Sequence, residues 1–200
     1  KKISKTYTIF LIITTIIFSI LTFNRNFVWR DSFSLWKTTV EYYPNNVKAH
    51  YNLAINYSKQ GDFSKAIEEY QKVITLDPED MMVTGHFALA LEYQKLKRYK
   101  EAIDEFNKAI LVHPVEIGPY LGLANLYVEI NEFNKTIEIY NKALQIKPND
   151  FVLYTNLSVI YYQKGMYKDA FEYGKKAYEL NPNDPLLQNN YQLLKKMIGH

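Results

Sequence analysis

Apolar residues recur through most of the chain at intervals of three and four, which is the spacing of one face of an α-helix. Leu53 and Tyr57 lie four residues apart, and so do Ala66 and Tyr70, so each pair shares a helix face. Gly61 lies between the two pairs, where a residue with left-handed backbone ends a helix at little cost. This stretch therefore predicts two short helices joined by a tight turn.

The same pattern returns three more times before the C-terminus. Its period is marked by prolines spaced 34, 36, 34 and 34 residues apart, namely Pro44, Pro78, Pro114, Pro148 and Pro182. A fixed period of this length is typical of helical repeat arrays, in which stacking buries the faces that one helix pair would leave exposed. The repeats are 47–80, 83–116, 117–150 and 151–184, with Met81 and Met82 as an insertion.

Equivalent places in the four copies carry similar residues. One set is Leu53, Leu89, Leu123 and Leu157, and another is Tyr57, Tyr93, Tyr127 and Tyr161. This arrangement resembles the tetratricopeptide repeat (TPR), a helix–turn–helix whose pattern has an aromatic residue, Leu-Gly, Tyr, Ala, Phe, Ala and Pro. The first aromatic place holds His50, His86, Tyr120 and Tyr154, and the Phe place holds Tyr70, Phe106, Tyr140 and Gly174. Gly174 is the clearest departure from the family pattern and predicts looser packing in the last repeat.

The resemblance implies an all-α fold, a TPR solenoid in which helix–turn–helix repeats form a right-handed superhelix. Residues 185–200 predict one more helix, which would cap the last repeat as a solenoid requires. Its apolar face consists of Leu187, Tyr191, Leu194 and Ile198.

An uncharged apolar segment, residues 7–23, precedes the repeats. Its length is at the short end of the roughly 17–25 residues that span a bilayer. A signal-peptide core and a buried soluble helix are alternatives. No small-residue cleavage site follows, however, and β-branched residues lie on every face, so we expect a retained transmembrane helix within residues 1–24. The lysines before it (Lys1, Lys2 and Lys5) favour a cytoplasmic N-terminal side and extracytoplasmic repeats, in a periplasm or the ER lumen.

Residues 25–46 predict a juxtamembrane half-repeat that covers the open face of the first repeat. Trp29, Phe33, Trp36 and Val40 form one helical stripe there. The passage Arg-Asn-x-x-Trp-x-Asp from Arg25 to Asp31, with the Leu-Trp and Pro-Asn-Asn that follow, resembles a particular junction. It is the entry into the repeats of multi-spanning TPR glycosyltransferases, the transmembrane O-mannosyltransferase family and its bacterial relatives. In that family the catalytic acidic residues lie upstream, so the resemblance places no catalytic residue on this chain.

Composition excludes several classes of function. The apolar fraction of 48% is too high for a disordered chain, and a net charge of +3 from scattered residues gives no case for nucleic acid. The absence of cysteine excludes disulfides, thiolate catalysis and cysteine zinc sites. The four histidines lack metal-ligand spacing, and we interpret His50 and His86 as packing residues. No phosphate-binding loop or nucleophile elbow is present, so we predict no enzyme, no cofactor and no metal. Gly118 and Gly122 are four apart, which we interpret as close helix packing.

The first helix of each repeat supplies most of the concave face in the TPR family. The resemblance implies that a peptide-binding groove is lined by Lys48, Tyr51, Asn52, Ile55, Lys59, Phe87, Leu91, Lys95, Leu121, Asn125, Val128, Asn156, Val159 and Tyr162. Asn52 and Asn156 stand where some family members use asparagine to hold a peptide backbone.

Two hypotheses of function follow. The first is a membrane-anchored TPR module that binds an extended peptide or a partner helix, with the bilayer as its second contact through residues 7–23. The alternative is an extracytoplasmic, substrate-recruiting TPR tail of an O-mannosyltransferase-like enzyme whose catalytic part lies outside this chain.

Overall fold

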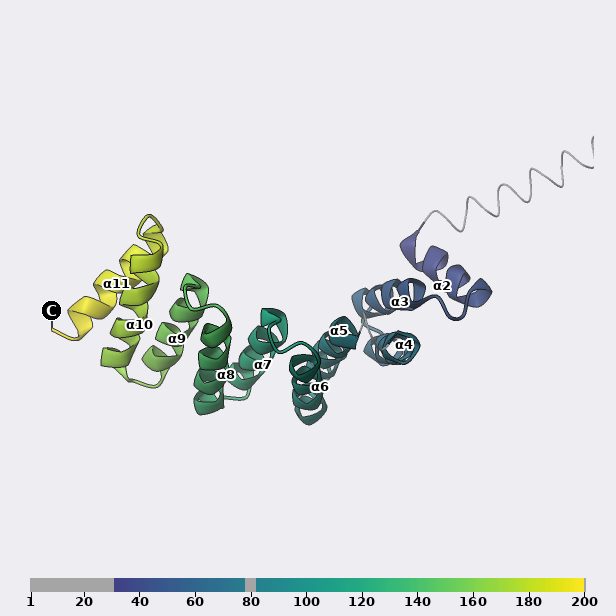
Figure 1. The fold of residues 1–200 in the computed structure, drawn as a ribbon, viewed down its shortest axis with the longest axis horizontal. Coiled ribbons are helices and arrows are strands. Elements are labelled where there is room, and N and C mark those ends of the chain that lie inside the picture. Colours follow the sequence, from purple (N-terminus) through teal and green to yellow (C-terminus); the bar gives the residue numbers. More distant parts are fainter. Residues whose placement is uncertain (1–30, 78–81, 200) are drawn as a thin grey trace, which may run out of the picture. The chain divides into compact units, whose positions relative to one another are not determined.

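The structure, a computed structural model, describes residues 31–77 and 82–199, which contain ten α-helices and no strand (Figure 1). They form two compact units that divide between Glu79 and Asp80. The N-terminal unit holds α2 (Ser32–Tyr42), α3 (Val47–Lys59) and α4 (Phe63–Leu76). The C-terminal unit holds α5 (Met82–Lys95), α6 (Tyr99–Val112), α7 (Ile117–Glu129), α8 (Phe133–Ile146), α9 (Phe151–Gln163), α10 (Tyr167–Leu180) and α11 (Pro185–Met197).

Side chains cap the start of several helices. Those of Asn46, Asp150 and Asp184 each accept hydrogen bonding from a backbone amide in the first turn of the helix that follows. Gly61 has a positive φ angle, as the sequence predicts, and so has Gly165, while the turns of the two middle repeats use Lys97 (φ 57°) and Asn131 (φ 59°) instead. All four helix pairs therefore turn in the same backbone conformation, although only two carry glycine.

The two helices of each repeat pack against each other, which confirms the all-α TPR fold. In the C-terminal unit each pair also packs on the next, so that α6 contacts α7 and α8 contacts α9 (Figure 1). Many of the fully buried residues are alanines, which let neighbouring helices come close together. They include Ala54, Ala66, Ala90, Ala102, Ala109, Ala124, Ala143, Ala170 and Ala177. The largest of the fully buried side chains are Phe106, Leu123, Leu126, Leu153 and Leu157, all in the C-terminal unit.

A flanking helix covers one end of each unit. In the N-terminal unit α2 packs on α3, where the rings of Phe33 and Tyr57 meet edge to face at 5.2 Å and Asn56 donates to the Ser32 hydroxyl. In the C-terminal unit α11 packs on α10 and buries Leu187 and Leu194. The expected apolar face of 185–200 thus lies inward.

The expected transmembrane helix, residues 7–23, and the tryptophan at position 29 lie outside the described residues. Among the helices that the structure does describe, none is both long and apolar enough to cross a bilayer.

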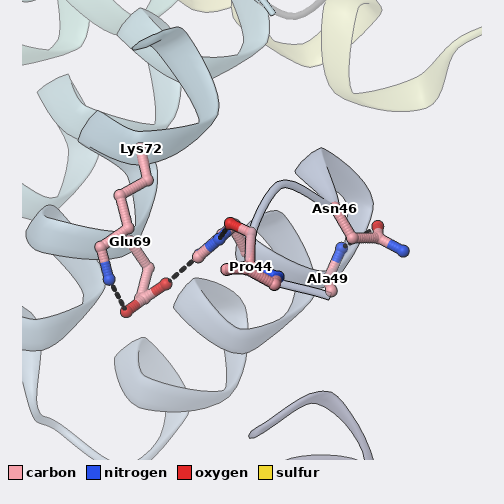
Figure 2. A network of polar contacts seen from close by, with 6 residues as sticks. Pro44, Asn46, Ala49, Glu69 and Lys72 are labelled. Carbon is pink, nitrogen blue, oxygen red and sulfur yellow. Dashed lines mark hydrogen bonds and ion pairs between the residues drawn. The ribbon is translucent and has the colours of Figure 1, made fainter. Parts of the chain in front are cut away.

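The first aromatic place of the repeat carries a buried ion pair in the first repeat. His50 is 2% exposed; its Nδ1 lies 2.5 Å from Glu69 Oε2, and its Nε2 lies 2.8 Å from the carbonyl oxygen of Pro44. Lys72 donates to the other oxygen of Glu69 at 2.9 Å, and Figure 2 shows Glu69 within this network. Histidine is therefore a packing residue here, held at both ring nitrogens.

The second repeat repeats this arrangement. His86 Nδ1 lies 2.5 Å from Glu105, and Lys108 donates to Glu105 at 2.7 Å. The third repeat has uncharged residues at these two places. Tyr120 stands where the first repeat has His50, and Ile139 stands where it has Glu69. The Tyr120 hydroxyl donates to the carbonyl of Pro114 at 2.9 Å, which is the contact that His50 makes in the first repeat.

If the two pairs are equivalent, the first repeat should accept tyrosine and isoleucine in place of His50 and Glu69. Glu69→Ile alone leaves His50 Nδ1 buried without a partner and should destabilise the N-terminal unit by about 1–3 kcal/mol. Adding His50→Tyr should recover most of that loss, since it recreates the pair of Tyr120 and Ile139 and a tyrosine hydroxyl can reach the Pro44 carbonyl. Urea denaturation of the three proteins measures both effects. A double variant no more stable than the single one contradicts the equivalence of the two pairs.

The second ion pair predicts a pH dependence. Burial alone would raise the pKa of Glu105, but the hydrogen bonds and charges of His86 and Lys108 outweigh it and hold that pKa below its usual range. Folding therefore favours ionised Glu105, and this stabilisation is present above the unfolded-state pKa of about 4.3 and is lost as the pH falls through the lower folded-state pKa. The stability advantage over Glu105→Gln should shrink between pH 6 and pH 3. The exposed neighbour variant Asp104→Asn is the control, and an advantage independent of pH contradicts the assignment.

Candidate partner-binding surface

We call the surface formed by the predicted groove residues the groove face and describe it separately in each unit. In the N-terminal unit Lys48 and Lys59 are exposed, while Tyr51 is half-buried with its ring edge-on against Tyr70 at 5.7 Å. Asn52 directs its amide nitrogen to the carbonyl of Lys48 in its own helix, at 2.7 Å. One amide hydrogen of Asn52 is thereby committed within the helix.

In the C-terminal unit the groove face begins with packed aromatic rings. Phe87 lies edge-on to Phe106 at 5.8 Å. The Phe106 ring also covers Gly122 of α7, because a β-carbon built at Gly122 would lie only 2.7 Å from Cζ of that ring. The interpretation of Gly118 and Gly122 as close helix packing holds for Gly122 only, since a β-carbon at Gly118 would meet nothing nearer than Glu116 Oε1 at 3.9 Å.

Two of the predicted residues, Leu91 and Lys95, line a shallow hollow with Glu129 of α7. Glu129 accepts hydrogen bonds from Gln94 at 2.6 Å and from the Tyr99 hydroxyl at 2.8 Å. These two bonds, that from Gln94 foremost, lower the pKa of Glu129. Lys95 is paired with the buried carboxylate of Glu92 at 2.7 Å. Lys95 and Glu129 are therefore already engaged within the protein, while Lys97 adds a further positive charge to the lining of the hollow.

A buried tyrosine lies near two of the predicted asparagines. The Tyr140 hydroxyl donates to Asn125 Oδ1 at 3.4 Å, which is long for a hydrogen bond. Burial raises the pKa of Tyr140, and the Asn156 side chain acts against it. The two predicted asparagines of this unit thus lie near the hydroxyl of one tyrosine.

At the C-terminal end, Val159 and Tyr162 line a hollow of about 220 Å³ between α9 and α11. Both are 43% exposed. The opposite wall comes from Asn190 and Leu193 of α11. Asn156 is not part of this lining, and Leu121 and Val128 are half-buried on α7.

Sequence reasoning missed five residues of this surface. Gln94, Tyr99 and Glu129 form polar contacts between repeats, which the repeat pattern does not record. Asn190 and Leu193 belong to the helix interpreted only as a cap. A signal for the last two exists, since Leu186, Asn190, Leu193 and Met197 have helical spacing on a stripe beside the buried one.

Gly122→Ala should destabilise the C-terminal unit by about 1–3 kcal/mol, because its methyl group would have to displace the fully buried Phe106 ring. The matched control is Gly118→Ala in the same helix, which has room for the methyl group and should change stability by less than about 1 kcal/mol. Thermal melts monitored by circular dichroism compare the two. Equal effects would show that Phe106 does not depend on the missing side chain.

Comparison with known families agrees with the helix pairs described above. Models of the tetratricopeptide repeat match residues 47–80, 83–114 and 151–184, and a further TPR repeat model matches 124–165. Together they cover more than half of the chain. The chain belongs to the tetratricopeptide repeat family. Such repeats form protein-interaction modules, and this one is an all-α module of that kind.

Solved structures of the same fold are numerous, with 405 matching chains, so the fold does not by itself select a partner. A crystal structure of MamA is 29% identical, with 74% of this chain and 85% of that chain covered and a TM-score of 0.64. MamA from Desulfovibrio magneticus RS-1 is 23% identical, with 76% of this chain and 85% of that chain covered and a TM-score of 0.64. YrrB, described as a TPR protein with an unusual peptide-binding site, is 18% identical, covering 82% and 83%, with a TM-score of 0.59. The last two show the fold alone.

A comparison with curated proteins gave no match. The family and structural matches concern the repeats, and they give no support to the expected glycosyltransferase junction.

Proposed function

We propose that this TPR protein is a binding scaffold whose groove face holds an extended peptide segment of a partner protein. One observation carries the proposal: Asn125 and Asn156, on the groove face of the third and fourth repeats, both lie near the buried Tyr140 hydroxyl, which donates to Asn125 Oδ1. An extended peptide has unpaired backbone groups, and an asparagine amide offers both a donor and an acceptor to them. An amide that already has a partner in the protein, as Asn125 does, loses less freedom when it binds.

The apolar neighbours of these amides fit the same role. Val159 and Tyr162 lie one and two turns beyond Asn156 on α9, where they offer contact area to peptide side chains. The charged groove-face residue of this unit, Lys95, is paired with Glu92, and Glu129 beside it accepts a hydrogen bond from Gln94. Binding would therefore rest on backbone hydrogen bonds and apolar contacts, with a small part for charge. The peptide-binding site ascribed to YrrB, which has the same fold, supports this by analogy only.

The proposal extends to location through the sequence outside the described residues. We propose that residues 7–23 anchor the protein in a membrane and that the repeats lie on its extracytoplasmic side, in keeping with the lysines that precede that segment. A reporter fused after the last residue should then be active outside the cytoplasm; activity confined to the cytoplasm contradicts this topology.

The glycosyltransferase-tail alternative rests only on the junction pattern between Arg25 and Asn46. The upstream reading frame tests it, because further hydrophobic spans with an acidic loop residue are required. The absence of enzymatic activity in this chain likewise stays a prediction.

The binding proposal is tested with peptides selected from a random 12-residue library displayed on phage. Asn125→Ala should weaken binding of the best peptide by about 1–3 kcal/mol, the cost of lost hydrogen bonds, which is roughly a 5- to 150-fold rise in Kd. Asn107→Ala is the matched control, since Asn107 is exposed on a second helix, α6, away from the groove face. Isothermal titration gives both values, and thermal melts verify folding. A peptide that is sensitive to Asn107→Ala or to Glu138→Ala on α8, but not to Asn125→Ala, would place the binding surface on the second helices.

A further inference from the structure

The Phe place of the fourth repeat lacks the ring that the other three repeats bury. Tyr70, Phe106 and Tyr140 occupy this place in repeats one to three, and their exposed fractions are only 4%, 0% and 3%. In each repeat the ring comes from the second helix and lies under the groove face; Tyr70 meets Tyr51 and Phe106 meets Phe87. The fourth repeat has Gly174 instead.

The space is only partly refilled by the protein. Leu194 of α11 leans over the glycine, with its Cδ1 at 2.9 Å from where a β-carbon would be, and Ser158 Oγ lies at 3.0 Å. Both side chains, together with Gly174 and Ala177, line the hollow of about 220 Å³.

The hollow is neutral, and its walls are mostly apolar. Val159, Tyr162 and Leu193 form its rim and are 43%, 43% and 55% exposed. No charged side chain lines it. Two of its polar groups are already bonded within the protein: Ser158 Oγ donates to the Ala170 carbonyl at 2.7 Å, and Thr155 donates to the carbonyl four residues before it.

Size and chemistry select the occupant. An apolar cavity of about 150 Å³ is large enough to bind benzene, so a hollow of about 220 Å³ has room for an aromatic side chain. A neutral lining disfavours a charged group, because the group would lose hydration without gaining a partner. Clustered exposed apolar side chains of this kind mark binding sites more often than chance exposure does.

We infer that this hollow takes the ring of an aromatic residue, Phe or Tyr, from the bound peptide, beside the place where the fourth repeat has Gly174 instead of a ring. The inference rests on the proposed function and makes it more specific: the partner carries an aromatic residue that docks between α9 and α11, about one turn along α9 from Asn156. The three rings buried at the equivalent place show that aromatic side chains pack well under this face.

The test uses the full 200-residue chain, the same displayed peptide library and two matched pairs of variants. Val159→Trp fills the hollow from its rim, while Val152→Trp places the same ring seven residues earlier on α9, at a similarly exposed position (46%) outside the lining. Asn190→Asp adds a charge to the lining without a change of shape, and Asn189→Asp adds it to the exposed neighbour outside it. Circular dichroism melts verify that each variant is folded.

Peptides selected by the intact chain should share an aromatic residue, and its replacement by alanine should raise Kd at least tenfold. Val159→Trp and Asn190→Asp should each raise Kd about tenfold, and their controls should stay within twofold. Peptides that bind without an aromatic residue, and equally well to Val159→Trp, overturn the inference but leave the proposed function. Failure to enrich any peptide overturns both. Concentration-dependent self-association in sedimentation that Val159→Trp abolishes would mean that a second copy of the chain occupies the hollow, which also overturns the inference.

Discussion

Helices in this protein come close to one another because small side chains stand where they cross. Ala54 and Ala66 are fully buried in the first repeat, and the equivalent places of the later repeats hold alanine except at Thr136 and Ser158, which are also buried. At Gly122 even a methyl group would be too large, since the Phe106 ring fills the space that a side chain would need. Interiors are packed densely enough that one methyl group is felt, so these places set the separation of neighbouring first helices. That separation in turn decides which side chains a partner can reach.

The Phe place on the second helix decides the chemistry of the groove face above it. Phe106 supplies a ring that seals the contact between α6 and α7. Tyr140 fills the same place with a ring and adds a hydroxyl, which orients Asn125 on the surface. Gly174 supplies nothing, and a hollow opens. The residue at this one place therefore sets the character of the surface in each repeat: closely packed in the second, polar in the third and hollow in the fourth. The helix pair around it is the same in all three.

The sequence predicts what depends on period and composition, namely the helix pairs, the final helix over 185–200 and the turn at Gly61. It does not predict features that depend on contacts between side chains of different helices, or on the backbone conformation of a single residue. The role of Glu69 is an example, because a glutamate on a second helix reads as solvent-exposed until a histidine nineteen residues away is seen to contact it. Lys97 is another, since a positive φ angle at lysine has no compositional signal. For the groove face, the pattern placed Asn125 correctly on a first helix, but it could not show that Tyr140 holds it. The departure at Gly174 was visible in the sequence, whereas the wall supplied by α11 was not.

The contact between a ring and the carbonyl six residues before it has a consequence for the loops that lead into the repeats. His50 holds the carbonyl oxygen of Pro44, and Tyr120 holds that of Pro114, so in both loops the anchored atom belongs to the main chain. Every amino acid carries that oxygen. The proline ring restricts the backbone, but the tether itself survives any side chain at that position, whereas it is lost when the histidine or tyrosine is removed. The hydrogen bond that holds each loop therefore tolerates replacement of the proline, Pro44 or Pro114. It does not tolerate loss of the ring in the next helix, His50 or Tyr120.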